Sequence, residues 1–451
     1  MKAREHWGSH LGLVFAAAGS AIGLGSLWKF PYVTGQNGGG AFVILYLFST
    51  LVICVPLFIA ELIMGRASQR GVVGAFANLS HSRNWRLVGW LAILSTLIVF
   101  SYYNVVAGWT LNYVLLSLAQ FTQGRSAEQI EGVFNVLVGA GDISIFWMTA
   151  FLVITGAVIY GGVQKGIEHW SKILMPALFI LLLGLLCYSV TLPGFGQAVR
   201  FMLYPDFSAL TPSGVLAALG LSFFTASLGF GIILTYGSYM RKEENIPKTA
   251  LTVLGLTLAI SVVAGLIIFP IIFTFGFPAA EGPGLVFKIL PVLFSQLPAT
   301  LILSTVFFLL LVFTALTSTV SLLENLVANG MELFNWSRKR ATLLTMGLVF
   351  LVGIPSALAG SGHLFPSWEA MYGENFFDTV STTWDRWFLP IAGFFTAIFV
   401  GWRMDKGIRD EEFLSQVKWR WTLPLWKALI RYVVPTVIVV FILEAAGVLN
   451  L

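Results

Sequence analysis

Glycine and hydroxyl-bearing residues interrupt two long hydrophobic segments of this chain. The segment 11–33 is broken by Gly19-Ser20-Ala21-Ile22-Gly23-Leu24-Gly25-Ser26, and the segment 215–236 by Ser227-Leu228-Gly229-Phe230-Gly231. A glycine costs a helix about 1 kcal/mol relative to alanine, so we expect both helices to unwind at these runs. Free N–H groups at the start of a half-helix suit a carboxylate, and exposed carbonyl oxygens suit Na⁺. The two interruptions therefore predict a binding site for an anionic group and a sodium ion.

Hydroxyl side chains near the interruptions could complete such a site. They are Ser26 in the first segment, Thr225 and Ser227 in the second, and Thr314, Thr317 and Ser318 in a third. Small and hydroxylated residues also serve the close packing of membrane helices, and that alternative applies to each residue taken singly. Two interrupted helices in one chain favour the central site of a transporter.

The composition is typical of a polytopic membrane protein. Of the 451 residues, 57% are hydrophobic and only 10% are charged, whereas soluble domains are about 25% charged. Cys54 and Cys187 lie in apolar segments, where we expect small buried residues and no disulfide framework. The five histidines are scattered without metal-ligand spacing, and no nucleophile–base motif is present, so we do not expect an enzyme.

Eleven segments are apolar and long enough to cross a bilayer, which takes about 20 residues. They are 11–33, 39–64, 87–119, 144–162, 168–192, 215–236, 247–276, 298–328, 341–359, 377–402 and 428–449. Lys and Arg concentrate in alternate connections, and the 403–431 connection alone contains seven of them. The positive-inside rule then predicts a cytoplasmic N-terminus and an external C-terminus. This distribution explains the net charge of +5 without a nucleic-acid partner.

The interrupted spans are the first and the sixth, which fixes the expected architecture. Five spans precede the sixth, so the two halves can form inverted repeats of five spans each. We expect an all-α fold with a first repeat at 1–192, a second repeat at 193–402, and a cytoplasmic loop with the eleventh span at 403–451.

Several motifs together resemble those of the neurotransmitter:sodium symporters over nearly the whole chain. They are Arg4-Glu5-His6-Trp7, the run from Gly19 to Gly25, Lys29-Phe30-Pro31, Asn37-Gly38-Gly39-Gly40-Ala41-Phe42, Ser227-Leu228-Gly229-Phe230-Gly231 and Leu316-Thr317-Ser318. The likeness is greatest to bacterial members that carry amino acids, including those with eleven spans. The resemblance implies a bacterial inner-membrane protein that works by alternating access.

The resemblance implies two sodium sites. The second site would use the carbonyl groups of Gly19, Ile22 and Thr314 and the hydroxyl groups of Thr317 and Ser318. The first site would use the Ala21 carbonyl, Ser26, Thr225, Thr257 and the substrate carboxylate. The family usually has asparagine at the position of Ser26 and asparagine or aspartate at that of Thr257. Hydroxyl groups thus replace stronger ligands, and we expect the first site to be weaker.

The resemblance also implies a pocket for an α-amino acid. The substrate carboxylate would meet the N–H groups of Leu24 and Gly25 and the Tyr103 hydroxyl. The ammonium would meet Ala21, Phe224, Thr225 and Ser227, and the side chain would lie among Val99, Tyr103, Phe224, Phe230, Ser318 and Leu322. Gly23 occupies the position where amine transporters have an aspartate, so an amine without its own carboxylate would lack a counter-ion. The apolar lining suits a neutral hydrophobic or aromatic side chain.

Charged and aromatic residues match the family's two gates. The inner gate would comprise Arg4, Trp7, Tyr239 and Glu332. The outer gate would contain Lys29, where arginine is usual, with Asp378 as the expected partner; Asp385 lies on the same helix face. Glu61 and Glu324 are further acids within spans, for which structural and functional roles are both open.

Two further features concern span 5 and chloride. Gly166 and Pro176 match a motif that lets the start of span 5 unwind and open a water path for the inner sodium, although an ordinary proline kink is the alternative. Tyr46 and Ser261 match chloride-site positions, but Leu221 stands where that site has glutamine. Ser261 also replaces the glutamate of a chloride-independent relative. Neither arrangement is complete, so a chloride requirement is left open.

We therefore expect a Na⁺-coupled symporter of neutral hydrophobic or aromatic L-amino acids. Its partners would be the amino acid and the lipid bilayer, with no nucleic acid, and the sequence does not define an oligomeric state. One alternative is a proton-coupled carrier, or a carrier of another substrate, with the same fold. A second alternative is an amino-acid sensor that binds its ligand without translocating it.

Overall fold

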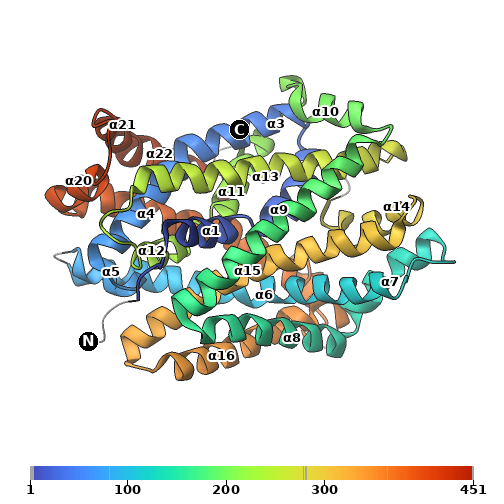
Figure 1. Cartoon of the computed structure of the whole chain (residues 1–451), viewed down its shortest axis with the longest axis horizontal. Coiled ribbons are helices and arrows are strands. Elements are labelled where there is room, and N and C mark those ends of the chain that lie inside the picture. The colour runs from blue at the N-terminus through green and yellow to red at the C-terminus, as the bar shows by residue number, and fades with distance from the viewer. Residues whose placement is uncertain (1–4, 81, 278, 280–281, 363, 449–451) are drawn as a thin grey trace.

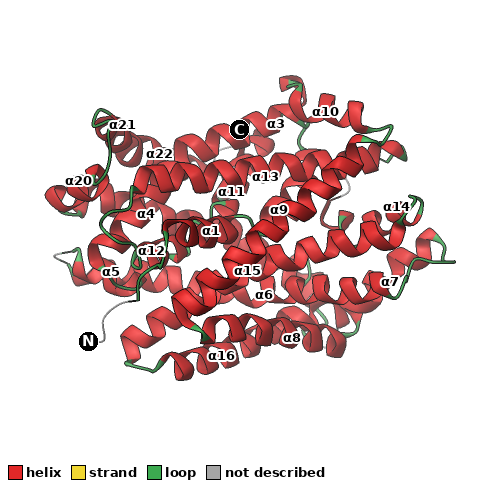
Figure 2. Cartoon of the chain, viewed as in Figure 1, coloured by secondary structure: helices red, strands yellow, loops and turns green. Residues whose placement is uncertain are grey.

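The chain folds as an all-helical protein (Figure 2). The computed structural model describes residues 5–448 except 81, 278, 280–281 and 363. In this part of the chain no strand forms, and one isolated bridge joins Gly39 and Pro205. The expected fold class is confirmed.

The helices are named as in Figure 1 where it labels them, and η denotes short π- or 3₁₀-helical segments; the first half of the chain comes first. They are α1 (His10–Ala21), η1 (Gly25–Lys29), α2 (Phe30–Gln36), α3 (Gly40–Ser49), η2 (Thr50–Cys54), α4 (Val55–Ser68), α5 (Val72–Asn78), η3 (Arg83–Trp85), α6 (Arg86–Leu118), α7 (Ala127–Gly139), α8 (Gly141–Tyr160), η4 (Val163–Glu168) and α9 (His169–Val190).

The second half continues with helices of similar kind. They are α10 (Phe195–Leu203), η5 (Phe207–Ala209), α11 (Pro212–Thr225), α12 (Ile232–Gly237), α13 (Ile246–Thr274), η6 (Gly282–Leu285), α14 (Ile289–Ser295), α15 (Thr300–Phe334), α16 (Arg338–Leu358), η7 (Ala359–Ser361), α17 (Trp368–Tyr372), α18 (Phe376–Thr383), η8 (Trp384–Phe388), α19 (Leu389–Ile398), η9 (Phe399–Arg403), α20 (Lys406–Leu414), α21 (Thr422–Ala428), η10 (Leu429–Val433) and α22 (Val434–Ala445).

Eight described helices are long and apolar enough to cross a membrane, and two bent pairs bring the number to ten. One bent pair is the first predicted span, His10–Ala21 with Gly25–Gln36, which bends by 48°. The other joins Phe376–Arg403, the tenth predicted span, to the short helix Lys406–Leu414. The sixth predicted span consists of α11 and α12, each too short to cross alone. Both predicted interruptions are therefore present in the fold.

The two longest helices, α6 and α15, pack against each other through the centre of the molecule (Figure 1). The broken helix α1 packs on α15, and α4 packs closely on α12. A Cβ atom at Gly65 of α4 would lie 2.0 Å from the Leu234 carbonyl oxygen of α12, so only glycine permits this approach. The two broken spans are thus held among long, continuous helices that can keep unwound backbone away from lipid.

The two ends of the molecule are built from short helices. Helices α5, α20 and α21 lie at one end, whereas α7, α10 and α14 lie at the opposite end (Figure 1). Between the ends, large apolar side chains such as Phe48, Ile180 and Leu343 are exposed on the outside of the bundle. This distribution is the one expected of a protein surrounded by lipid.

Candidate functional site

The break in the first span leaves backbone groups pointing at α6. Helix α1 ends at Ala21, and regular helical structure resumes at Gly25. The free Leu24 N–H donates to the Tyr103 hydroxyl oxygen at 2.9 Å. Two of the three groups expected to meet a substrate carboxylate, the Leu24 N–H and the Tyr103 hydroxyl, are therefore adjacent. A Cβ atom at Gly23 would lie 2.6 Å from the Ser318 hydroxyl oxygen, so this position has no room for a side chain.

The break in the sixth span depends on backbone conformations that favour glycine. Helix α11 ends at Thr225 and α12 begins at Ile232. Between them, Ser227, Gly229 and Gly231 have φ values of 54°, 82° and 78°. Glycine adopts positive φ without steric cost, whereas Ser227 does so under strain. The Ser227 hydroxyl donates to the Ser20 carbonyl at 2.9 Å, and this bond joins the two breaks.

A small cavity lies between the two breaks, and it brings together all of the predicted substrate residues except Leu24. Its lining is Ser20, Ala21, Gly23, Gly25, Val99, Tyr103, Phe224, Thr225, Ser227, Phe230, Ile232, Ser318, Ser321 and Leu322. The roles given to these residues stay predictions, but the geometry places them around one space.

The residues of the predicted second sodium site lie where α1 meets α15. The Ser318 hydroxyl donates to the Gly19 carbonyl at 3.4 Å, and the Thr317 hydroxyl donates to the Thr314 carbonyl at 2.9 Å. A Cβ atom at Gly19 would lie 2.9 Å from the Thr317 Cβ, so the two helices are in close contact. Ile22 caps the end of α1 and is fully buried. These neutral oxygen atoms have the chemistry that Na⁺ prefers.

The predicted first sodium site contains a hydroxyl oxygen suited to an ion. Ser26 is fully buried, and its hydroxyl has no hydrogen-bond partner within the described parts of the chain. Thr225 accepts a hydrogen bond from the Tyr46 hydroxyl at 2.9 Å. The Thr257 hydroxyl donates to the Val253 carbonyl at 3.0 Å, which leaves its lone pairs available. The donor set therefore fits a cation, although with neutral hydroxyl groups only.

The groups matched to a chloride site form a chain of hydroxyl groups. The Tyr46 hydroxyl lies 3.2 Å from the Ser261 hydroxyl, and the Ser261 hydroxyl donates to the Thr257 carbonyl at 3.0 Å. Leu221, at the position of the family's glutamine, contributes no polar side chain.

A larger cavity of about 810 Å³ lies above the substrate pocket, and Tyr103 and Phe224 line both spaces. We call this larger cavity the vestibule, and Lys29 is part of its lining. The Lys29 Nζ lies 2.6 Å from Asp385 Oδ2 and 4.7 Å from the centre of the Phe224 ring. The Tyr102 hydroxyl also donates to Asp385, at 3.2 Å. These contacts place a charged pair over the pocket.

The predicted partner of Lys29 was wrong, because Asp378 is not paired with it. Asp378 lies in the first turn of α18, where its N–H donates to the Asn375 side chain and its carboxylate accepts from the Asn375 amide at 2.7 Å. Asp385 is two turns further along, in the π-helical segment η8. Helix capping thus engages Asp378 and leaves Asp385 as the lysine's partner.

The opposite side of the pocket is closed by the N-terminal segment. The Trp7 backbone N–H donates to the Tyr239 carbonyl and its indole N–H to the Tyr236 carbonyl, both at 3.1 Å. The Tyr239 hydroxyl donates to Glu324 at 2.6 Å, and Arg338 binds the same carboxylate at 2.7 Å. Trp7 and Tyr239 therefore lie together, and their role in an inner gate stays a prediction.

Two other predicted gate residues have different outcomes. Arg4 lies outside the described residues. Glu332 accepts a hydrogen bond from the Gly71 N–H at 2.7 Å and lies 3.5 Å from Arg70. Glu324 is recognisable in the sequence as an acid within a span, but its partner Arg338 is not, and the only signal for Arg338 is its position at the start of the next helix. Ser20 and Ser321 in the pocket lining were also missed.

The start of the fifth span is wound and tied to the N-terminal segment. Residues 163–168 form the π-helical segment η4, and Pro176 lies inside the following helix α9. The Glu168 carboxylate accepts from the Gly8 N–H at 2.7 Å and the Ser9 hydroxyl at 2.8 Å. The motif from Gly166 to Pro176 is therefore in its helical form, and any unwinding of it would have to break these bonds.

Comparisons with known proteins agree with this geometry. The Sodium:neurotransmitter symporter family matches residues 4–124 and 125–450. A sodium-dependent transporter of Bacillus subtilis, YhdH, is 36% identical over 98% of each chain, and one of Haemophilus influenzae is 34% identical over 98% of each. The crystal structure of MhsT in complex with L-phenylalanine is 39% identical in sequence, with a TM-score of 0.90 over 98% of this chain and 100% of that one.

A multi-pass membrane protein with two broken helices around a shared pocket is a transporter and not an enzyme. The chain belongs to the sodium:neurotransmitter symporter family, and it is a sodium-dependent transporter with the fold of MhsT.

Proposed function

We propose that this protein is a Na⁺-coupled symporter of neutral hydrophobic or aromatic L-amino acids. The observation that carries the proposal is the pairing of the Leu24 N–H with the Tyr103 hydroxyl beside the broken sixth span. Both groups can turn to a carboxylate, and the lining of Val99, Phe230 and Leu322 suits an apolar side chain. The phenylalanine bound to MhsT, at 39% identity, supports the same substrate class.

The sodium ion would couple to this pocket through α15. Ser318 lines the cavity and also contacts the Gly19 carbonyl of α1, so an ion held there would fasten α1 to α15 beside the substrate. The membrane potential contributes about 2.3 kcal/mol per charge per 100 mV, so one coupled Na⁺ suffices for substantial accumulation.

Alternating access would proceed between the two gates. In the described conformation the vestibule reaches the pocket from one side, while the Trp7, Tyr239 and Glu324 contacts close the other. Loosening of the N-terminal segment from Glu168 would free the start of span 5 for release of the inner ion. We assign spans 1–5 and 6–10 to inverted repeats, with the N-terminus in the cytoplasm and the C-terminus outside a bacterial inner membrane.

Uptake into proteoliposomes tests the proposal. Labelled phenylalanine, tryptophan and leucine would be offered under an inward Na⁺ gradient and under an equal K⁺ gradient. Accumulation with Na⁺ alone is the expected result. Equal uptake in both would contradict sodium coupling and favour a proton-coupled carrier. Sodium-dependent binding without uptake or counterflow would contradict transport and favour a sensor.

A further inference from the structure

The connection between the tenth and eleventh spans presents cations and tryptophans side by side. Trp419 and Trp421 are 68% and 66% exposed, although tryptophan is a residue that folded proteins mostly bury. Lys418 and Arg420 alternate with them in the chain and are also exposed. We call residues 418–421 the basic aromatic turn. Its surface offers positive charge and flat aromatic rings together.

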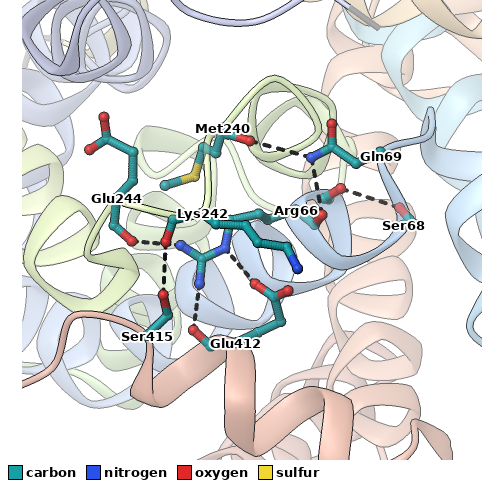
Figure 3. Close-up of polar contacts among 9 residues, drawn as sticks. Arg66, Ser68, Gln69, Met240, Lys242, Glu244, Glu412 and Ser415 are labelled. Carbon is teal, nitrogen blue, oxygen red and sulfur yellow. Dashed lines mark hydrogen bonds and ion pairs between the residues drawn. The ribbon is translucent and has the colours of Figure 1, made fainter. Parts of the chain in front are cut away.

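The structure holds this turn in place at its N-terminal side. Arg66, whose side chain is 1% exposed, pairs with the Glu412 carboxylate and donates to the Glu412 and Glu244 carbonyls at 2.6 and 2.5 Å (Figure 3). The Ser415 hydroxyl then donates to the Lys242 carbonyl at 2.8 Å (Figure 3). These bonds fasten α20 to the end of α4 and to the connection before α13.

The C-terminal side of the turn is also anchored. The Trp426 indole N–H donates to the Pro56 carbonyl of α4 at 3.0 Å, and Lys427 lies 2.5 Å from Asp410 of α20. The exposed tryptophans are thus presented by a segment fixed at both ends. A fixed arrangement lowers the ordering cost of binding a ligand on this surface.

The charges of the turn are available to a ligand. Arg409 and Lys427 are both paired with Asp410. Lys418 and Arg420, in contrast, have no ion pair within the described chain. A surface on which two unpaired cations alternate with two exposed indoles suits a ligand that has a negatively charged group next to an apolar part.

The position of the turn next to the eleventh span indicates where such a negatively charged group would come from. The turn directly precedes Thr422–Ala445, a helix long and apolar enough to cross a membrane, so it lies at the end of that span. Trp402 and Tyr432, both exposed and 5.6 Å apart, mark the membrane boundary there as interfacial aromatic residues do. The turn therefore lies at the depth of lipid headgroups.

We propose that the basic aromatic turn binds the headgroup of an anionic phospholipid. Lys418 and Arg420 would meet the phosphate and its negative charge, while Trp419 and Trp421 would lie at the interface between headgroups and acyl chains. The proposal rests on the orientation proposed above only in assigning the lipid to the cytoplasmic leaflet.

Tryptophan quenching by brominated lipid tests the proposal with the whole protein in vesicles. The vesicles contain phosphatidylcholine with an increasing fraction of brominated phosphatidylglycerol, or of brominated phosphatidylcholine as the neutral probe. We expect the anionic probe to quench more strongly. In K418Q/R420Q, the affinity for phosphatidylglycerol relative to phosphatidylcholine should fall about 30-fold, since each cation near an anionic surface contributes about fivefold.

Two further variants make the test specific. R241Q/K242Q removes two exposed cations that have no exposed tryptophan next to them in the sequence, keeps the Lys242 carbonyl that accepts from Ser415, and should keep the anionic preference. W419F/W421F should lower the excess quenching by the anionic probe, since it removes the indoles of the turn and leaves other exposed tryptophans such as Trp402. A loss in R241Q/K242Q equal to that in K418Q/R420Q would overturn the proposal, and so would an excess quenching by the anionic probe that is unchanged in W419F/W421F.

Quenching of the wild-type protein gives a third outcome that could contradict the proposal. No preference for phosphatidylglycerol over phosphatidylcholine would overturn the lipid assignment and leave a soluble partner protein as the occupant of the turn. Sodium-driven uptake, measured on the same vesicles, distinguishes this failure from a failure of the proposed transport function, because the quenching signal does not depend on translocation.

Discussion

Replacing Tyr103 with phenylalanine removes one hydroxyl group from the pocket and leaves the ring in place. In the structure this hydroxyl accepts the Leu24 N–H at 2.9 Å, and in the proposed complex it would donate to the substrate carboxylate. A hydrogen bond to a charged group contributes about 1.5–3 kcal/mol. We therefore expect the dissociation constant of an amino acid to rise about 10- to 150-fold, at 1.4 kcal/mol per tenfold.

Equilibrium binding of labelled phenylalanine at saturating Na⁺ measures this effect. Tyr113→Phe is the matched control, because Tyr113 is a buried residue of the same helix whose hydroxyl donates to the Phe287 carbonyl at 2.8 Å. Both variants lose one buried hydrogen bond, but only Tyr103→Phe should lose substrate affinity. An affinity within twofold of the wild type in folded Tyr103→Phe would refute the carboxylate position.

Three further predictions test the sodium site, the outer gate and the pocket. Thr317→Val should raise the Na⁺ concentration needed for half-maximal phenylalanine binding about tenfold, since it removes one oxygen ligand without changing the side chain's shape; an unchanged Na⁺ dependence would contradict the site. Asp385→Asn should raise the rate of substrate dissociation about tenfold more than Asp378→Asn does, because only Asp385 pairs with Lys29; equal dissociation rates in the two variants would contradict the assignment of Asp385 as the partner of Lys29. Gly23→Ala should abolish binding measured by calorimetry, since its Cβ would lie 2.6 Å from a pocket hydroxyl oxygen; binding of wild-type strength would show that the pocket adapts.

The glycine runs made the two breaks predictable from the sequence. A run such as Gly229-Phe230-Gly231 disfavours helix wherever it stands, and the observed φ values of 82° and 78° at the two glycines follow from that local property. The membrane class was equally accessible, because apolar length alone decides whether a helix can span a bilayer.

The residues of the pocket lining could be predicted from the sequence where a family motif marks their position. Tyr103, Phe224 and Ser318 do line one cavity, as the family resemblance implies. Ser20 and Ser321 were missed because a hydroxyl in a membrane helix is more often a packing residue, and only the rotation of each helix decides which way it faces.

Charge pairing was decided by the tertiary structure. Asp378 and Asp385 share a helix face, and no spacing rule distinguishes them; capping by Asn375 and the position of η8 select Asp385. Arg338 reaches Glu324 across a helix connection for the same reason. The sequence by itself determined which segments are helical, where they break and which chemistry they carry, because those properties are local. The partners of the charged groups depend on how the helices pack, because an ion pair requires atoms from distant segments to lie within a few ångströms of each other.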